Sequence, residues 1–138
     1  MRVIGIIPAR YDSTRFPGKP LAMIHGKTMI HRAFERARQA TLLSKVVVAT
    51  DDLRIFNHVI EFGGEAAMTS VSHPSGTDRC AETISKYSNE FDLVINIQGD
   101  EPYIFPQQID LLINTIKNSD AQIGTLVKQI TTREELFS

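Results

Sequence analysis

Three cationic side chains, Arg10, Arg15 and Lys19, lie within ten residues of one another after the first apolar run of the chain. Guanidinium and ammonium groups stay protonated at neutral pH and offer forked and point-charge donors, which suit phosphate oxygens. Backbone N–H groups near Gly18 can add neutral donors. A solvated basic loop is the alternative, but this spacing directly after a buried strand favours an anion-binding loop over residues 8–20.

This loop matches neither of two common glycine-rich phosphate motifs. A P-loop would need glycine at Ser13 and a hydroxyl residue at Pro20, on either side of Gly18 and Lys19. No G-x-G-x-x-G follows the first strand, which disfavours a dinucleotide site. The predicted anion site therefore depends on its cationic side chains.

A second polar segment, residues 98–102, follows the apolar run 93–97 and contains Gln98 and Asp100. A carboxylate at the end of a strand, beside a phosphate-binding loop, is well placed to hold Mg²⁺ against phosphate oxygens. The alternative is a strand-end turn with solvated acids. We take Asp100 as the candidate metal ligand.

A third segment, residues 73–79, leads into a helical pattern. Ser75 or Thr77 can cap that helix. Arg79 falls in the first helical turn, where a positive charge is unfavourable for the helix dipole, so we expect a ligand or an aspartate beside it.

Short β-branched runs alternate with helical patterns along the chain, which predicts an α/β fold. Right-handed crossovers then give a mostly parallel sheet with helices on both faces, and the loops after the strands converge at one edge. Predicted strands cover residues 3–7, 45–50, 65–68, 93–97 and 123–127, and predicted helices cover 29–40, 53–62, about 76–87 and a segment beginning at Pro106. Asp51 or Asp52 caps the second helix, and Gly63-Gly64 ends it.

The length of 138 residues and the 42% hydrophobic content fit one domain over residues 1–138. The net charge of −1 argues against a general nucleic-acid binder. Residues 1–45 carry nine basic and two acidic side chains, a balance of +7, and the remainder balances at −8, which indicates a local anion site and a separate cation site. No run approaches the ~18 apolar residues of a membrane span, so we expect a cytoplasmic protein without membrane insertion.

The last residues resemble the start of a helix. Residues 132–135 form a capping box, and an apolar stripe begins just before the chain ends at Ser138. A helix nucleus with nothing to propagate is unstable, so we expect the chain to be the N-terminal part of a longer protein.

Together, three segments resemble the 3-deoxy-manno-octulosonate cytidylyltransferases, or CMP-Kdo synthetases. Residues 7–21 read IPARYDSTRFPGKPL, residues 73–79 read HPSGTDR and residues 96–102 read NIQGDEP. The resemblance covers the whole chain in order. It implies a Rossmann-like nucleotide-diphospho-sugar transferase fold and a reaction of CTP with the sugar acid Kdo, which gives CMP-Kdo and pyrophosphate for lipopolysaccharide biosynthesis.

The resemblance also implies residue roles. Arg10 and Lys19 would bind and neutralise the triphosphate with Arg15 nearby, and Asp100 would hold Mg²⁺. The remaining implied substrate contacts, on the base and ribose side and at the start of the first motif, are Pro8, Ala9, Ser75, Arg79 and Gln98. In the family, the second half of the protein supplies another metal-binding carboxylate, much of the sugar-acid pocket and the main surface of a homodimer.

Three alternatives stay open. The chain could be a nucleotide-binding fragment without independent activity, or a relative of the CMP-sialate synthetases. It could also be a glycosyltransferase of similar fold, although a donor without a γ-phosphate needs fewer cations than this loop carries.

Overall fold

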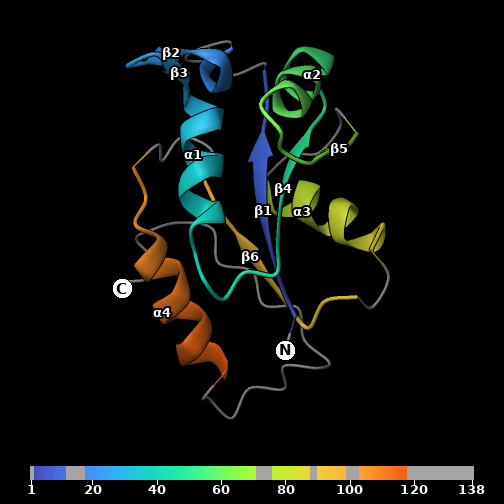
Figure 1. The fold of residues 1–138 in the computed structure, drawn as a ribbon. Helices are drawn as coiled ribbons and strands as arrows, with labels where there is room; N and C mark the ends of the chain where they lie inside the picture. Colours follow the sequence, from blue (N-terminus) through green and yellow to red (C-terminus); the bar gives the residue numbers. More distant parts are fainter. Residues whose placement is uncertain (1, 12–17, 71–75, 88–89, 99–102, 118–138) are drawn as a thin grey trace.

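The computed structural model describes residues 2–11, 18–70, 76–87, 90–98 and 103–117. In this part of the chain, strands and helices alternate as the sequence predicts (Figure 1). The main sheet contains β1 (Val3–Ala9), β4 (Lys45–Thr50), β5 (Ala66–Met68) and β6 (Leu93–Asn96), and the helices are α1 (Met29–Arg38), α2 (Leu53–Glu61), α3 (Gly76–Ser85) and α4 (Pro106–Lys117). The strand predicted over 123–127 and the capping box at 132–135 lie outside the described residues.

The four strands are all parallel and lie in the order β5-β4-β1-β6. The chain builds outward from β1 through β4 to β5, and α3 then returns it to the other side of β1. The predicted parallel sheet is therefore confirmed. Successive strands are added on one side of β1 as far as β5, and the strand order then reverses, because β6 lies on the other side of β1.

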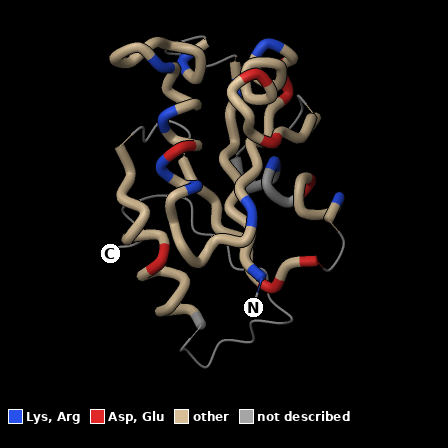
Figure 2. The backbone as a smooth tube through the Cα atoms, viewed as in Figure 1, with Lys and Arg blue, Asp and Glu red and all other residues tan. Residues whose placement is uncertain are grey.

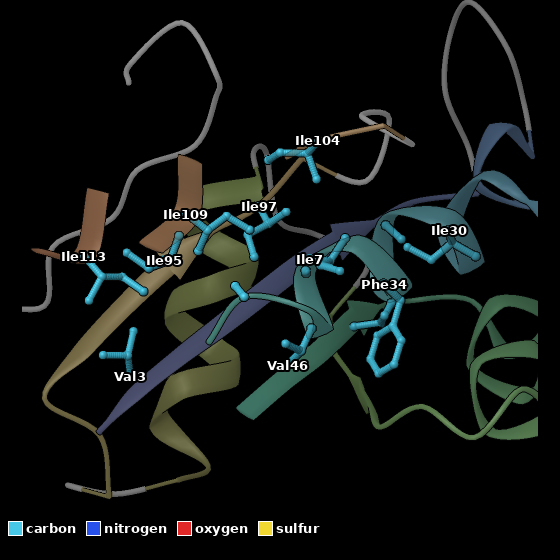
Figure 3. Packing of buried hydrophobic residues seen from close by; sticks show 14 of the residues in the cluster. Val3, Ile7, Ile30, Phe34, Val46, Ile95, Ile97, Ile104, Ile109 and Ile113 are labelled. Carbon is cyan, nitrogen blue, oxygen red and sulfur yellow. The ribbon is translucent and has the colours of Figure 1, made fainter. Parts of the chain in front are cut away.

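Helices cover both faces of this sheet, as predicted. Alternate residues of β1 point to opposite faces, so Val3 and Ile7 join one core cluster while Ile4 and Ile6 join another. The first cluster includes the buried stripe of α1, the buried residues of α2 and three isoleucines of α4, and Figure 3 shows several of these side chains together. The second cluster packs against Ile84 of α3 and the neighbouring Tyr87.

The ends of α2 follow the predicted capping. The Asp52 carboxylate accepts a hydrogen bond from the Arg54 N–H at 2.8 Å, so Asp52 is the cap and Asp51 is left for another contact. After the helix, Gly63 has φ +90°, a conformation that favours glycine. The N–H of Gly64 then bonds the Val59 carbonyl at 2.8 Å and closes the end of the helix.

A two-stranded hairpin precedes α1 and was not predicted. Its strands β2 (Met23–Ile24) and β3 (Lys27–Thr28) are joined by His25 and Gly26, which have φ of 51° and 88°. Arg32 of α1 donates to the carbonyls of Ile24 and His25 and ties the hairpin to the helix. Figure 2 shows that Lys and Arg recur on the hairpin and along α1. No helix in the described ranges is long and apolar enough to cross a membrane.

Candidate functional site

The loops that follow β1 and β6 begin at the point where the strand order reverses. The Ile97 N–H bonds the Ile6 carbonyl at 2.8 Å, just beyond the last paired position of β6. From Ile7 to Ala9, β1 continues beside β4, and the described part of the sheet has no strand on its other side there. In open α/β sheets, ligands bind outside the carboxyl ends of the strands at such a switch point.

The predicted basic loop starts directly from this end of β1. Pro8 and Ala9 are the last two residues of β1 and pair with Ala49 and Thr50 of β4. Arg10 follows and is exposed. Ala9 is buried at 3% exposure, so its side chain belongs to the core and its backbone forms the edge of the site.

The other end of the loop returns to Tyr11. The Gly18 N–H donates to the Tyr11 carbonyl at 2.7 Å, and Gly18 adopts φ +75°. A Cβ on Gly18 would lie 3.0 Å from Cε2 of Tyr11, so both the conformation and the contact require glycine. Lys19 then begins the short helix η1 (Lys19–Leu21) and is half-buried. The structure therefore brings the regions of Arg10 and Lys19 together, on either side of this backbone bridge.

Arg79 occupies the neighbouring part of the same edge. It is fully buried, and its guanidinium donates to the Asp51 carboxylate at 3.1 Å. The other terminal nitrogen donates to the Thr69 hydroxyl and, at 3.3 Å, to the Ser70 carbonyl. Asp51 follows β4 and Thr69 follows β5, so Arg79 ties two strand ends to the first part of α3. The aspartate that the sequence predicted beside Arg79 is Asp51.

Two buried polar atoms at this edge have no hydrogen-bond partner among the described residues. One is Nε of Arg79, and the other is Oδ1 of Asn96, the last residue of β6. A buried polar group without a partner costs free energy, so both atoms offer unused hydrogen-bonding capacity. Gln98, two residues after Asn96, is half-buried.

The pKa of the Asp52 carboxylate, at the start of α2, is shifted. Its hydrogen bonds with the Arg54 side chain are the main cause and hold its pKa below the ordinary aspartate value. Asp52 therefore stays ionised and keeps Arg54 oriented.

Arg15, Ser75 and Asp100 lie outside the described residues. Among the residues that the structure does describe, no group of three or more His, Cys, Asp and Glu side chains could hold a metal ion. His31 and His58, which show no metal-ligand spacing in the sequence, pack against Phe62 at ring-centroid distances of 4.1 and 5.2 Å.

Sequence reasoning missed some partners at this edge. The sequence placed Thr69 in a loop expected at this edge but gave it no partner, and it did not predict that Arg54 lies over the Tyr11 ring. A usable signal existed only for Thr69, because the end of a predicted parallel strand belongs to the binding edge.

The cytidylyltransferase family model matches residues 4–138. A 3-deoxy-manno-octulosonate cytidylyltransferase of Parabacteroides distasonis is 51% identical over all of this chain and 54% of its own length. The chain thus spans about half the length of the curated relatives it matches.

Solved structures of cytidylyltransferases also match this chain. The structure of a CMP:2-keto-3-deoxy-manno-octonic acid synthetase complexed with CTP has a TM-score of 0.84 and 46% identity, and covers 88% of this chain and 49% of the other. A cytidylyltransferase of Leptospira borgpetersenii has a TM-score of 0.73 and 25% identity, over 87% of this chain and 51% of its own.

Proposed function

Because this chain belongs to the cytidylyltransferase family, we propose that it is the CTP-binding part of a 3-deoxy-manno-octulosonate cytidylyltransferase. The enzyme transfers CMP from CTP to the sugar acid and releases pyrophosphate. The observation that carries this proposal is the 51% identity, over the whole chain, to a relative named for this activity. The basic loop at the switch point of the sheet agrees with it.

The proposed reaction is a displacement at phosphorus. The oxygen of the anomeric hydroxyl of the sugar acid gives up its proton to solvent water and forms a bond to the α-phosphorus. The bond from that phosphorus to the oxygen bridging to the β-phosphate breaks, and pyrophosphate leaves with the electron pair. Such a reaction depends on positioning and charge neutralisation, which Arg10 and Lys19 are suited to provide with Arg15 between them in sequence.

We assign the metal to Asp100 on the sequence pattern. Mg²⁺, when bound, supplies positive charge against the phosphate oxygens. Asp100 lies two positions after Gln98 in the sequence. Its carboxylate is a hard oxygen ligand of the kind that Mg²⁺ prefers.

The base and ribose of CTP are assigned to the remaining predicted residues. Gln98 is supported by its half-buried position after β6, and Arg79 by its buried Nε without a partner among the described residues. Pro8 and Ala9 contribute through the end of β1, and Ser75 is assigned on its motif alone. We further propose that residues 1–138 form a nucleotide-binding domain of a cytoplasmic, homodimeric enzyme that serves lipopolysaccharide biosynthesis.

A pyrophosphate-release assay with CTP, Mg²⁺ and Kdo tests this function. The assay compares this chain with a C-terminally extended form, and we expect turnover in the extended form. Lys19→Ala and Asp100→Ala in that form should each lower turnover by about two orders of magnitude or more. The first removes a positive charge that neutralises the reacting phosphates, and the second removes the carboxylate that would hold Mg²⁺. Near-normal turnover in either variant would remove that residue from the mechanism.

A second candidate is nucleotide binding without turnover by this chain alone, since it spans about half of its relatives. Titration calorimetry with CTP separates binding from catalysis. A glycosyltransferase would instead bind a CMP-sugar at least as well as CTP, so the same titration with a CMP-sugar distinguishes the two enzyme classes.

A further inference from the structure

We propose that Arg54, in the first turn of α2, is a positioning residue for the phosphate-binding loop. It acts by holding Tyr11, and it need not touch the nucleotide. This inference rests on the proposed function, since it assumes that the loop between Arg10 and Lys19 receives a triphosphate.

Arg54 lies directly over Tyr11. Its Cζ is 3.3 Å from the centroid of the Tyr11 ring, well within the ~6 Å at which a cation is attracted to an aromatic face. Because α2 begins next to the carboxyl end of β4, this contact joins the loop after β1 to the neighbouring strand.

The guanidinium is itself held in place by Asp52. Nε donates to Oδ1 of Asp52 at 3.1 Å, and Nη2 donates to Oδ2 at 2.7 Å. The Asp52 carboxylate also accepts from the backbone N–H of Arg54 at 2.8 Å as the cap of α2. A two-point pair of this kind fixes the plane of the guanidinium, which a single-point ammonium contact does not.

Holding Tyr11 restrains both ends of the loop. Arg10 precedes Tyr11 directly, and the Tyr11 carbonyl accepts the N–H of Gly18 at 2.7 Å, one residue before Lys19. The Tyr11 ring also meets Gly18, since a Cβ there would lie 3.0 Å from Cε2. A shift of the Tyr11 ring therefore moves the attachment points of both Arg10 and Lys19.

The contribution of Arg54 is expected in ligand binding more than in stability. Its side chain is 59% exposed, and exposed ion pairs add little to the free energy of folding. A loop that is already positioned, in contrast, loses less conformational freedom when it binds triphosphate.

The test measures CTP affinity of Arg54→Ala by titration calorimetry, and KM and kcat where the protein turns over. We expect Kd and KM for CTP to rise by about three- to twentyfold, the size of one cation–π contact, with a small change in kcat. Arg54→Lys should raise Kd and KM for CTP nearly as much as Arg54→Ala does, because lysine keeps the charge but loses the two-point pair with Asp52.

Arg38→Ala is the matched control. Arg38 is also an exposed arginine over an aromatic ring, with Cζ 5.8 Å from the Phe34 centroid, but it lies at the C-terminal end of α1, away from the binding edge. Its loss should leave CTP affinity unchanged. An Arg54→Ala variant that binds CTP as tightly as Arg38→Ala overturns the proposal.

Variants of Tyr11 test the same contact from the other side. Tyr11→Leu removes the aromatic face that Arg54 covers and should weaken CTP binding as Arg54→Ala does. Combining Arg54→Ala with Tyr11→Leu should weaken binding no further than either change alone. Full additivity of the two effects would refute a shared role.

Trypsin cleavage without nucleotide separates this proposal from the proposed function. Trypsin can cut after Arg10 and Arg15, but Pro20 protects the bond after Lys19. We expect Arg54→Ala to speed the first two cuts severalfold relative to Arg38→Ala, and equal rates would count against the positioning role. If the parent chain and its extended form both fail to bind CTP, the proposed function is wrong, and the cleavage rates still report on Arg54.

Discussion

At the scale of single residues, Arg79 combines full burial with a permanent charge. Its guanidinium is matched by the carboxylate of Asp51, the hydroxyl of Thr69 and the carbonyl of Ser70. Removing one partner from such a pair leaves an uncompensated charge in a medium that solvates it poorly. The structure of this edge thus depends on Asp51, although the sequence offered both Asp51 and Asp52 for the simpler role of helix cap.

We expect Asp51→Ala to lower the free energy of unfolding by about 3 kcal/mol, because it leaves the buried guanidinium without its counter-charge. Urea unfolding measures the effect. The double change Asp51→Ala with Arg79→Met should recover part of the loss, since it removes the charge as well.

Glu90→Gln is the control for that measurement. It breaks the ion pair between Arg2 and Glu90, whose side chains are 57% and 53% exposed at a separation of 3.9 Å. Its cost should stay below about 0.5 kcal/mol. Equal losses of unfolding free energy in Asp51→Ala and Glu90→Gln would mean that the buried Asp51–Arg79 pair contributes no more to stability than an exposed ion pair.

At the scale of elements, α1 and α2 meet through a small polar and aromatic cluster. Thr28 caps α1 by accepting the His31 N–H at 3.3 Å, and its hydroxyl also lies 2.6 Å from Nε2 of His58 on α2. His31 stacks on Phe62 with an interplanar angle of 2°. Desolvation by this packing lowers the pKa of His31, and nearby Glu35 opposes the shift, while Lys27, His58 and Arg32 add to it.

The lowered pKa of His31 predicts a pH dependence of stability. At pH values between the folded and unfolded pKa of His31, the unfolded chain binds more protons than the folded chain does. The contribution of neutral, packed His31 to the free energy of unfolding is therefore intact above about pH 6.5 and is lost as pH falls through the folded pKa. His31→Phe keeps a ring on Phe62 and should reduce the stability difference between about pH 7.5 and about pH 5.5. His31→Gln should also reduce this stability difference, but it should lower the free energy of unfolding at both pH values because the ring on Phe62 is missing.

Urea unfolding at both pH values checks this prediction. An unchanged pH dependence in His31→Phe would show that protonation of His31 is not what weakens the contact between α1 and α2.

The sequence predicted the regular elements well because each has its own local signal. Buried strands such as Lys45–Thr50 are continuous β-branched runs, and the apolar stripe of α1 recurs with helical spacing. The hairpin before α1 was missed because its two-residue strands are too short for any periodicity. Its turn residues His25 and Gly26 were the only local sign.

Contacts between distant residues were harder to predict. The polar type of Arg79 and its place in a first helical turn pointed to an acidic partner, and the helix dipole supplied the reason. No comparable rule joins Tyr11 to Arg54, because their contact depends on the register that brings the ends of β1 and β4 together.

At the scale of the whole molecule, the proposed function predicts selective stabilisation by nucleotide. A ligand that binds only the folded chain raises its melting temperature by mass action. Mg²⁺-CTP should therefore raise the melting temperature of this chain more than Mg²⁺-ATP does, and Lys19→Ala should weaken the CTP effect. Thermal denaturation at matched nucleotide concentrations measures both, and equal shifts with CTP and ATP would contradict the cytidine assignment.

The pairing of β1 with β6 also determines the stage of protein synthesis at which the sheet can be completed. Val3 is matched with Leu93, so β1 acquires its second neighbour only after β4, β5 and the helices before β6 have been synthesised. Pairings between such distant segments close large loops and slow folding. Arg10 and Gln98 begin to share one binding edge only when that late strand docks. A nascent chain stalled before β6 would hold the basic loop without the strand end that faces it.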